Sequence, residues 1–474
     1  MKYNITTKNI TKSLDKGFII DMIKSLKSKS YSFHILCSLT VLAVPTVIEE
    51  IMSTLLQYVD TAMVGNLGEN ATASVSVTTT INWLVGSVPS AIGIAAIALI
   101  SRAVGKKDCE ESKKASSQIF ILSVISGALL TVLCLILSPF IPVWMGAEKE
   151  IQKTASLYFA IISVPMIFRV INIVMGACLR ATKNTKTPMI ITLFENILNI
   201  VLNYILIYKV GLGVIGAAIG SAVSFAVSGA AMYFAYRKND FLRYHLGSLS
   251  FDSKVLSECM KTAFPVLLTH CASCMGYVVF AGLVSSMGTT VFAAHSIAVS
   301  AEQIFYIAGY GFRSATSTMI GMSIGEKNQR KFKAVQKTSI LITVLMMFIS
   351  GTALYYTSFA IMDLLTSSDA VAVLGSQMLK LVAFSEPFFG LMIVLEGIYY
   401  GLSKTKYVFI AETASMWLIR IVFTFLCVKI FRLGLYEVWL CMIADNIFKA
   451  VLLAIPFVFK KVNYPTKGEI NNDN

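Results

Sequence analysis

Ionisable and amide side chains interrupt several long apolar stretches of this 474-residue chain, and Asp60 is the clearest case. It stands inside the segment LLQYVDTAMVGNLG, which runs from Leu55 to Gly68. A carboxylate at membrane depth costs about 2.5–3.5 kcal/mol on insertion scales. Protonation or a bound hard cation removes the bare charge, because carboxylate oxygen suits such ions. Asp60 is therefore predicted to switch between a charged state and an ion-bound or protonated state, and an ion gradient can shift the balance between the two.

A second polar group lies on the fifth apolar stretch of the chain. Asn199 and Asn203 are spaced i, i+4 and therefore share a helix face, which Glu195 and Asn196 extend into a polar stripe. Their amide oxygens can ligate Na⁺ or accept hydrogen bonds. The pattern leaves two interpretations open, a coupling site facing the bundle interior or hydrogen bonds that hold neighbouring helices together.

Acids and aromatic residues also mark the second half of the chain. Glu302, Tyr306 and Tyr310 fall within SAEQIFYIAGYGF, and Glu386 and Glu396 lie on a later apolar stretch. A carboxylate beside aromatic rings suits an amphipathic cation. These five residues are predicted to line a substrate cavity, and the alternative is that the acids form internal ion pairs.

The elements that position these groups are predicted to be membrane helices. The chain is 56% hydrophobic and 14% charged, whereas soluble proteins carry roughly 25% charged residues. Apolar runs long enough to cross about 30 Å of hydrocarbon recur twelve times. Their continuous apolarity excludes a barrel, whose strands alternate. The prediction is an all-α polytopic membrane protein with spans near 36–64, 75–103, 115–138, 155–179, 187–208, 212–236, 258–286, 291–322, 337–360, 374–401, 406–430 and 434–459.

The chain repeats itself at a constant offset in the numbering. The offset pairs Pro45 with Pro265, and each proline is expected to kink its helix. Six spans per half give both halves one orientation, so we expect two pseudo-symmetric six-helix bundles with a cavity between them. Asp60 pairs with Phe280, so the acid would serve only one bundle. Further paired landmarks are Gly68 with Gly288, Gly105 with Gly325, and Thr185 with Thr405.

Basic residues predict the orientation in the membrane. They gather in alternate connections, and seven lysines lie between Lys2 and Lys29 alone. By the positive-inside rule both termini are expected to be cytoplasmic. The leader is interpreted as an amphipathic helix on the membrane surface or as a disordered basic tail. The expected regions are a leader 1–34, an N-terminal bundle 35–240, a cytoplasmic linker 241–257, a C-terminal bundle 258–460 and a cytoplasmic tail 461–474.

Several other functions are disfavoured by the sequence. The basic residues behind the net charge of +14 cluster in the connections between apolar spans. They therefore indicate the orientation of the chain in the membrane rather than a nucleic-acid partner. The motif Gly211-Leu-Gly213-Val-Ile-Gly216 follows a membrane-length helix rather than a strand, so it does not predict nucleotide binding. Those glycines are expected to make a tight turn and let the sixth span pack closely. His270, Cys271 and Cys274 lack a second pair at ligand spacing, so no metal centre is predicted apart from a possible Na⁺ at Asp60.

Six segments carry a resemblance to the MATE family, the multidrug and toxic compound extrusion transporters. The resemblance covers roughly residues 36–460 and implies two six-helix bundles around a central cavity in the plasma or inner membrane. It implies export of amphipathic, often cationic drugs in exchange for Na⁺ or H⁺, with no cofactor; we expect a monomer. The segments are PTVIEEIMSTLLQYVDTAMVGNLG, ALISRAVGKKD, GACLRATKNTKTPMIITLFENILNIVLNYILIY, GLGVIGAAIGSAVS, AHSIAVSAEQIFYIAGYGF and MIGMSIGEKNQRK.

The resemblance also implies a coupling site in the N-terminal bundle. Asparagine and hydroxyl positions of the family match Asn172, Asn199 and Ser221, beside Asp60. Asn203 departs from the pattern, because some relatives have an acid there, and a two-carboxylate proton relay is therefore not expected. Ser273 stands where other relatives carry an acid on the seventh helix, so that second coupling site is expected to be absent.

Two alternatives are kept beside drug transport. A flippase of lipid-linked precursors, from the same wider superfamily, would be expected to have a strongly basic cavity, whereas the intramembrane charge here is mainly acidic. A membrane-embedded enzyme would need a catalytic constellation such as paired metal-binding acids, and none stands at recognisable spacing. The prediction is a transporter rather than an enzyme.

Overall fold

The computed structural model describes residues 6–244, 251–459 and 464, with side chains at 31–244, 251–457, 459 and 464. Every regular element within this described part is a helix. Ten helices are long and apolar enough to cross a membrane, and two further helix pairs pass the same test together as bent spans. The predicted all-α polytopic fold is therefore confirmed, with twelve spans if each bent pair counts as one.

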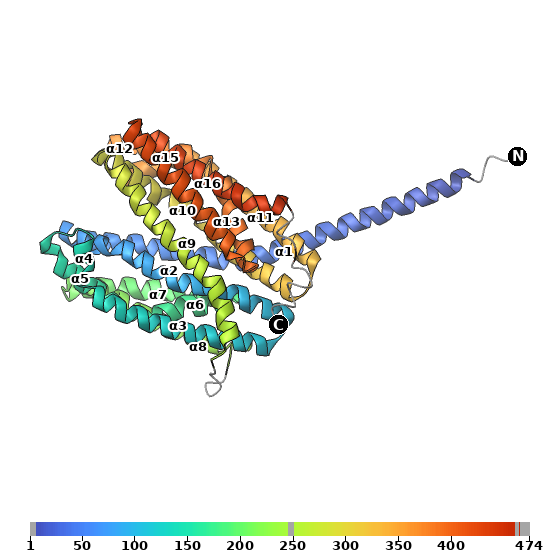
Figure 1. Cartoon of the computed structure of the whole chain (residues 1–474), viewed down its shortest axis with the longest axis horizontal. Helices are drawn as coiled ribbons and strands as arrows, with labels where there is room; N and C mark the ends of the chain where they lie inside the picture. The colour runs from blue at the N-terminus through green and yellow to red at the C-terminus, as the bar shows by residue number, and fades with distance from the viewer. Residues whose placement is uncertain (1–5, 245–250, 460–463, 465–474) are drawn as a thin grey trace.

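The helices form two bundles that follow each other in the sequence (Figure 1). The first bundle holds α1 (Thr6–Gly65), α2 (Glu69–Lys106), α3 (Cys109–Leu137), α4 (Ile141–Trp144), α5 (Lys149–Ser163), α6 (Met166–Ala181), α7 (Lys186–Tyr204), the π-helix η1 (Ile205–Lys209) and α8 (Gly213–Arg237). The second holds α9 (Ser253–Ser285), α10 (Thr289–Gly325), α11 (Gln329–Leu365), α12 (Asp369–Ala383), α13 (Glu386–Gly401), α14 (Thr405–Ala414), η3 (Ser415–Ile421), α15 (Val422–Phe425), η4 (Leu426–Ile430) and α16 (Leu435–Val458).

Two of the predicted spans are not single straight helices. The expected span 155–179 is divided between α5 and α6, which bend by 51°, and the expected span 374–401 is divided between α12 and α13, which bend by 56°. Pro165 is the N-cap of α6, and Pro387 stands in the first turn of α13. Proline lacks the N–H that would continue the preceding helix, so it ends one helix and starts the next.

The backbone reproduces the internal repeat down to its caps. Lys107 and Lys327, which the repeat pairs, both have left-handed φ angles, of 59° and 50°. The next residues, Asp108 and Asn328, are N-caps whose side-chain oxygens accept hydrogen bonds from the following backbone N–H groups.

The repeat slips by one position near its end. The π-helix η1 begins at Ile205, and its counterpart η4 begins at Leu426. The numbering difference between these two residues is one larger than the difference between Lys107 and Lys327. The additional residue falls in the region of η3. A π-helix takes up one more residue per hydrogen-bonded turn than an α-helix, so η3 can absorb the insertion without ending the span.

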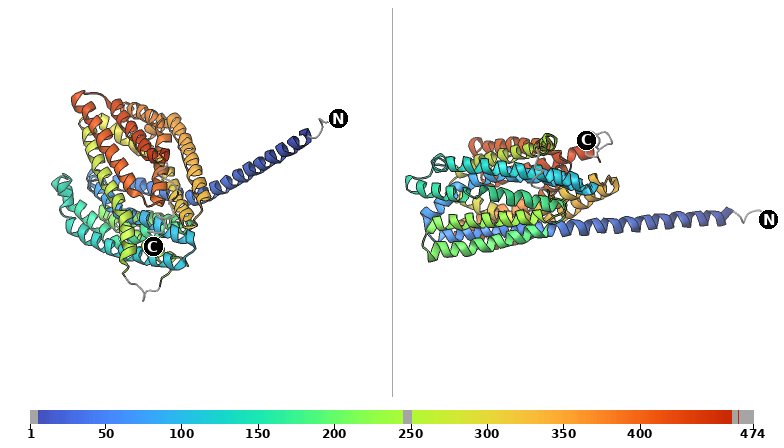
Figure 2. Two further views of the ribbon diagram at one scale, coloured as in Figure 1. Left: turned by 45° about the vertical axis from the view of Figure 1, so that its right-hand side comes forward. Right: turned by 90° about the horizontal axis from the view of Figure 1, so that it is seen from below.

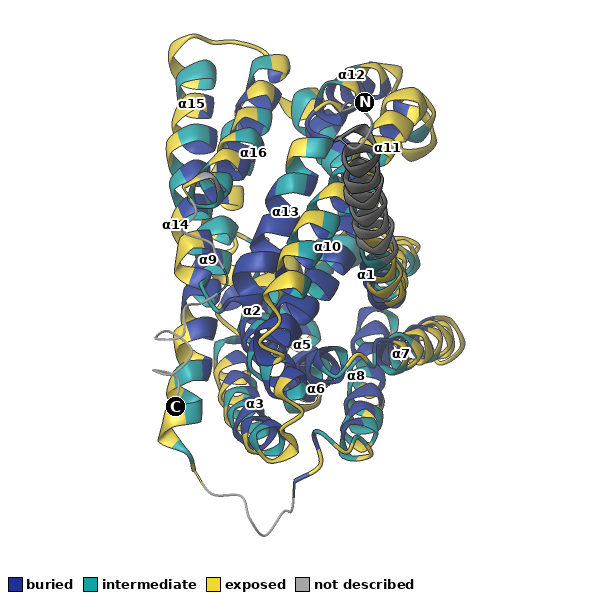
Figure 3. Cartoon of the chain, turned by 90° about the vertical axis from the view of Figure 1, so that its right-hand side faces the viewer, coloured by how far each residue is buried: buried dark blue, intermediate teal, exposed yellow. Residues whose placement is uncertain are grey.

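The two bundles meet where α2 and α10 cross near their C-terminal ends. A Cβ built at Gly105 would lie 2.3 Å from the Met322 carbonyl oxygen, and one at Gly325 would lie 2.0 Å from that of Arg102. The bundles converge toward this end and diverge toward the end that carries α4 and α12 (Figure 1). Figure 3 shows the central helices α2, α10 and α13 as the most buried, while outer helices such as α3 and α11 expose apolar faces.

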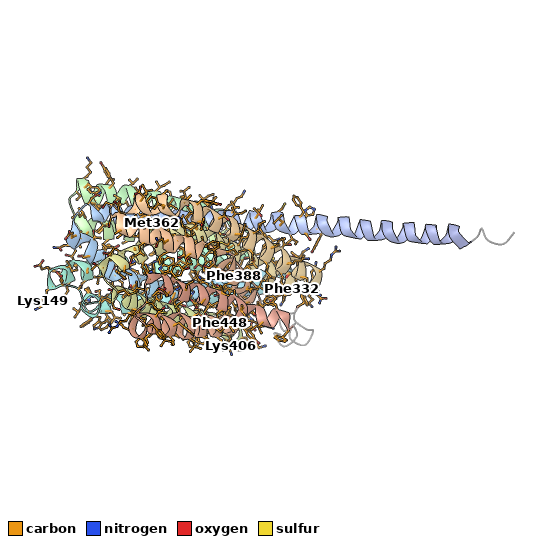
Figure 4. The ribbon with its side chains drawn as sticks, turned by 90° about the horizontal axis from the view of Figure 1, so that it is seen from above. Lys149, Phe332, Met362, Phe388, Lys406 and Phe448 are labelled. Atoms are coloured by element: carbon orange, nitrogen blue, oxygen red, sulfur yellow. The ribbon has the colours of Figure 1, made fainter. Side chains whose placement is uncertain are left out.

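The leader enters the fold through α1. This helix begins at Thr6, extends well beyond both bundles and continues without a break into the first span (Figure 2). Side chains of the leader before Tyr31 lie outside the described residues, so its association with the membrane surface stays a prediction. Pro45 and Pro265 lie inside α1 and α9, and the kink expected at each stays a prediction. Lys149 lies at the end of the molecule opposite the leader (Figure 4).

The glycine contact between the bundles predicts a position-specific effect of one methyl group. Gly105→Ala should lower the thermal stability of the purified protein, because overpacking of a tight contact costs about 1–3 kcal/mol. Gly86→Ala is the matched control on the same helix, since no heavy atom lies within 4 Å of its built Cβ. The control should be neutral or slightly stabilising, because alanine favours the helix. Equal melting temperatures for the two variants would contradict the close approach.

Candidate functional site

A chain of hydrogen bonds links Asp60 on α1 to Ser221 on α8 through α7. Asn203 Nδ2 donates to Asp60 Oδ1 at 2.9 Å and to Asn199 Oδ1 at 2.9 Å. Asn199 Nδ2 in turn donates to Ser221 Oγ at 3.1 Å. Both asparagines are almost completely buried. Four residues expected at the coupling site, contributed by three helices, are thus brought together.

Close packing of α8 against α7 holds this chain in place. A Cβ at Gly220 would lie 2.1 Å from Asn203 Oδ1, so only glycine leaves room for the amide. A Cβ at Gly216 would come within 2.8 Å of the Leu206 backbone. Gly211 and Gly213 adopt positive φ angles of 78° and 55° in the turn before α8. The glycine motif therefore makes the tight turn and close helix packing that the sequence predicts.

Asn172 lies in a neighbouring cluster rather than in the chain itself. Its Nδ2 donates to Glu195 Oε2 at 2.8 Å and to Ser228 Oγ at 3.3 Å. Arg169 interacts electrostatically with Glu195, and its guanidinium lies over the Phe225 ring. Sequence reasoning did not identify Arg169 as a partner of Glu195.

Unpartnered amide oxygens indicate how a small cation could bind here. The Oδ1 atoms of Asn172 and Asn203 are buried and have no hydrogen-bond partner. Carboxylate and amide oxygens are the ligands that hard cations such as Na⁺ prefer. Among the described residues, no group of three or more His, Cys, Asp and Glu side chains could hold a metal ion. The available donors therefore suit a lightly held monovalent cation, or a proton on Asp60, better than a transition metal.

A cavity of about 520 Å³ in the first bundle adjoins both clusters. Asp60, Asn172 and Ser221 line it, whereas Asn199 and Asn203 are not among its lining residues. Its wall also carries the aromatic rings Trp83, Tyr158 and Phe225. The ionisable side chains in the wall, apart from Tyr158, are the carboxylates of Glu49, Glu50, Asp60 and Glu195 and the guanidiniums of Arg169 and Arg180.

One of these carboxylates forms an ion pair inside the bundle. Arg180 Nη1 lies 3.1 Å from both carboxylate oxygens of Glu49. Arg169 and Arg180 are eleven residues apart, close to three helical turns, so both face the cavity from one side of α6. That spacing is the sequence signal that could have identified the two arginines.

The residues expected to line a substrate cavity in the second bundle are arranged differently. None of the five lines the 520 Å³ cavity. Glu396 accepts a hydrogen bond from Arg313 at 2.9 Å, and the same guanidinium lies 4.7 Å from the centre of the Tyr310 ring. The Tyr306 ring packs edge-on against Tyr310. Their role in substrate binding stays a prediction, and Tyr310 alone reaches a pocket, of about 170 Å³, that lies between the bundles.

The other two acids of that set are buried close to a charged cluster. Glu302 and Glu386 interact electrostatically with each other, and Glu302 with Arg420. Arg420 Nε lies 2.8 Å from Asp445 Oδ2, and Lys449 Nζ lies 3.0 Å from the same oxygen. The alternative expectation of an internal ion pair therefore holds for Glu396, and Asp445 forms a further pair of this kind.

Comparison with known families decides which kind of protein this is. A profile of the MatE family matches residues 45–205 and again residues 265–426, more than half of the chain. The chain belongs to the MatE family. The family signature therefore occurs twice, once in each half of the chain.

The similarity of this MatE protein to its relatives extends over most of the chain. A probable multidrug resistance protein NorM of Thermotoga maritima is 27% identical over 426 residues, which cover 89% of this chain and 91% of the relative. A solved outward-facing multidrug resistance MATE family transporter of the MOP superfamily aligns with a TM-score of 0.84 at 20% identity, covering 93% of this chain and 96% of that chain.

A further structural neighbour differs in its described pocket. It is a MOP superfamily transporter from Pyrococcus furiosus, for which a reverse polarity of the binding pocket suggests a different function. It aligns with a TM-score of 0.85 at 20% identity over 90% of this chain and 96% of that chain. At this level of identity both structures show the fold alone. The family match and the ten to twelve candidate spans make this MatE protein a multi-pass membrane protein.

The ion pair in the cavity wall predicts measurable energetic coupling between its partners. Glu49→Gln and Arg180→Gln should each destabilise the protein, and the double variant should lose less than their sum, giving an interaction energy of about 0.5–3 kcal/mol. The exposed pair Lys106–Glu111, at 2.8 Å, is the control and should give only about 0.2–1 kcal/mol. Both cycles are measured by denaturation of the purified protein in one detergent. A coupling at Glu49–Arg180 no larger than the surface value would contradict the pairing.

Proposed function

We propose that this protein is a secondary active multidrug efflux antiporter, which exports amphipathic and cationic compounds in exchange for Na⁺ or H⁺. Membership of the MatE family and the names of the relatives support export of drugs. The observation that carries the proposal is the chain from Asp60 to Ser221 at the wall of an acidic cavity. As a transporter it needs no enzymatic step and no cofactor.

The geometry supports ion coupling at Asp60. Among the described residues, its carboxylate receives one side-chain hydrogen bond, from Asn203, and no ion pair. A proton or Na⁺ that binds there neutralises a charge which is otherwise costly at membrane depth. Because Asn203 also binds Asn199, and Asn199 binds Ser221, a change at Asp60 is transmitted to α7 and α8.

The cavity supports binding of a drug-sized ligand. Its volume of about 520 Å³ lies within the usual range of small-molecule sites. Aromatic rings and aliphatic side chains such as Leu56 and Ile173 can cover the apolar part of an amphipathic compound. The cavity wall holds four carboxyl groups and only two guanidiniums, and this excess of acidic groups favours a positively charged compound.

Alternating access follows from the arrangement of the bundles. They touch at the end where the leader extends and diverge at the other end (Figure 1). We place the protein in the plasma or inner membrane with both termini in the cytoplasm. The cavity then faces outward in this conformation. Transport then requires the contact of Gly105 and Gly325 to separate while the opposite ends close. We propose that a monomer is sufficient, since the first bundle of one chain forms the 520 Å³ cavity.

The flippase alternative lacks a supporting observation. A carrier of lipid-linked phosphates would need unpaired basic groups in its cavity, as phosphate recognition relies on arginine and lysine. Arg180 is paired with Glu49, and Arg169 interacts with Glu195. The polarity of this cavity is therefore acidic. Measurement of ethidium efflux and of lipid-precursor flipping in the same vesicles would separate the two functions.

Asp60→Asn tests the proposed coupling site. The variant should insert in the membrane and purify normally, because an amide keeps the size and the hydrogen-bonding capacity of the carboxyl group. Gradient-driven ethidium efflux from cells or vesicles should be abolished, since the amide neither protonates nor binds a cation comparably. Asp108→Asn, an exposed N-cap, is the control. Unchanged efflux by Asp60→Asn would refute coupling at this residue.

The coupling ion can be identified with the same purified protein. Proteoliposomes that contain the wild-type chain should accumulate or release ethidium when either a Na⁺ gradient or a pH gradient is imposed, one at a time. Asp60 and the unpartnered amide oxygens can accept either Na⁺ or a proton. We therefore expect at least one of the two gradients to drive transport. Transport that responds to neither gradient would refute the antiport mechanism, and dependence on ATP alone would replace it.

A further inference from the structure

The charges in the wall of the 520 Å³ cavity do not balance. Four carboxylates face two guanidiniums. Glu49 is paired with Arg180 at 3.1 Å, while Glu195 accepts the hydrogen bond of Asn172 and interacts with Arg169. Two carboxylates are left without a basic partner in that wall. One is Asp60, which the proposed function assigns to the coupling ion, and the other is Glu50.

Glu50 is unpaired and faces the space between the bundles. It lines both the 520 Å³ cavity of the first bundle and the 170 Å³ pocket between the bundles. Glu50 is exposed, although it lies in the middle of a membrane span. Its carboxylate forms no hydrogen bond or ion pair with any residue that the structure describes. It therefore presents an unpaired carboxyl group at the junction of two cavities.

The arginines that act on Glu50 are already neutralised. Arg180 and Arg313 both interact electrostatically with Glu50. Arg180 is engaged by Glu49 at 3.1 Å, and Arg313 by Glu396 at 2.9 Å. Each of these two guanidiniums thus already has a carboxylate partner, and Glu50 has no guanidinium of its own. A bare carboxylate at this depth is costly, so its retention indicates a positively charged ligand.

The position of Glu50 separates it from the coupling site. The two acids are ten residues apart on α1, which corresponds to about 15 Å along the helix axis. A single bound compound with one positive group reaches one of them, not both, with its charge. Apolar and aromatic lining residues, including Leu56 and Trp83, are available for the remainder of such a compound.

We propose that Glu50, rather than Asp60, receives the positive charge of the transported organic cation, so that substrate and coupling ion bind to different carboxylates of one cavity. The proposal rests on the proposed function and specifies its substrate class. Glu50 determines the preference for cations, and Asp60 determines coupling to the gradient. Both charges can then occupy the cavity without competing for the same oxygen atoms.

Binding of ethidium, tetraphenylphosphonium and rhodamine 6G to the purified full-length protein separates the two roles. Glu50→Gln should weaken binding of all three cations at least tenfold, and Glu50→Ser should do the same if the first variant purifies poorly. Glu50→Asp should retain most of the affinity. Asp60→Asn should leave the affinities within twofold of wild type. Glu69→Gln is the control, since this exposed acid begins α2 and does not line the cavity.

The outcomes distinguish this inference from the proposed function. Unchanged cation binding by Glu50→Gln, or an equal loss in Asp60→Asn, would overturn the assignment of Glu50 even where the wild type transports. Glu50-dependent binding without gradient-driven transport would uphold the assignment and refute the antiport mechanism. Failure of the wild-type protein to bind any of the three cations would overturn the substrate class itself.

Discussion

The cost of charge at membrane depth is the constraint on which the rest of this structure depends. Among the described intramembrane acids, Glu49 pairs with Arg180 and Glu396 with Arg313 of another helix, while Asp445 pairs with Arg420 of η3 and with Lys449 of its own helix. Removal of one partner would leave an uncompensated buried charge, so such pairs fix their helices relative to each other. Asp60 instead accepts a hydrogen bond from the amide of Asn203, and the proposed coupling to an ion rests on that difference.

Duplication of the bundle did not duplicate this availability. The residue equivalent to Asp60 is Phe280, and the Arg420 guanidinium lies 5.6 Å from the centre of its ring. Arg420 belongs to η3, the π-helical segment in the region where the second half holds one additional residue. The second bundle thus carries a permanent cation beside the position at which the first bundle carries an open carboxylate. The two bundles therefore share a fold but carry different side chains at this position.

The sequence predicts the elements of this structure better than their partners. Twelve apolar runs, the repeat and the shared face of Asn199 and Asn203 follow from composition and periodicity, which depend on the local chain. The bends before α6 and α13 were missed, because continuous apolarity hides a break that needs only one proline. Asn172 and Ser221 were predicted from a resemblance alone, and Asn172 lies in a neighbouring cluster, since a motif does not specify which amide hydrogen is donated to which oxygen.

The acids of the second bundle show the same limit. Glu302, Glu386 and Glu396 are placed on apolar helices by the sequence, but helical periodicity cannot distinguish a face toward a cavity from a face toward an arginine on another helix. The pairing of Glu396 with Arg313 depends on the approach of α13 to α10, which is a tertiary property. Glu50 is the converse case, because its neighbour Glu49 takes the arginine that would otherwise neutralise it.

Helix α1 connects these charges to the relative position of the bundles. Tyr58 and Asp60 are two residues apart, about 200° around the helix, so they face opposite sides. The Tyr58 hydroxyl donates to the Ser300 carbonyl oxygen of α10 at 2.9 Å, whereas Asp60 accepts from Asn203 of α7. Under the proposed coupling, an ion that replaces Asn203 at Asp60 would weaken the tie of α1 to its own bundle and leave its tie to the other bundle intact. Pro45 removes one backbone hydrogen bond closer to the point where the bundles converge, so α1 can respond by bending there.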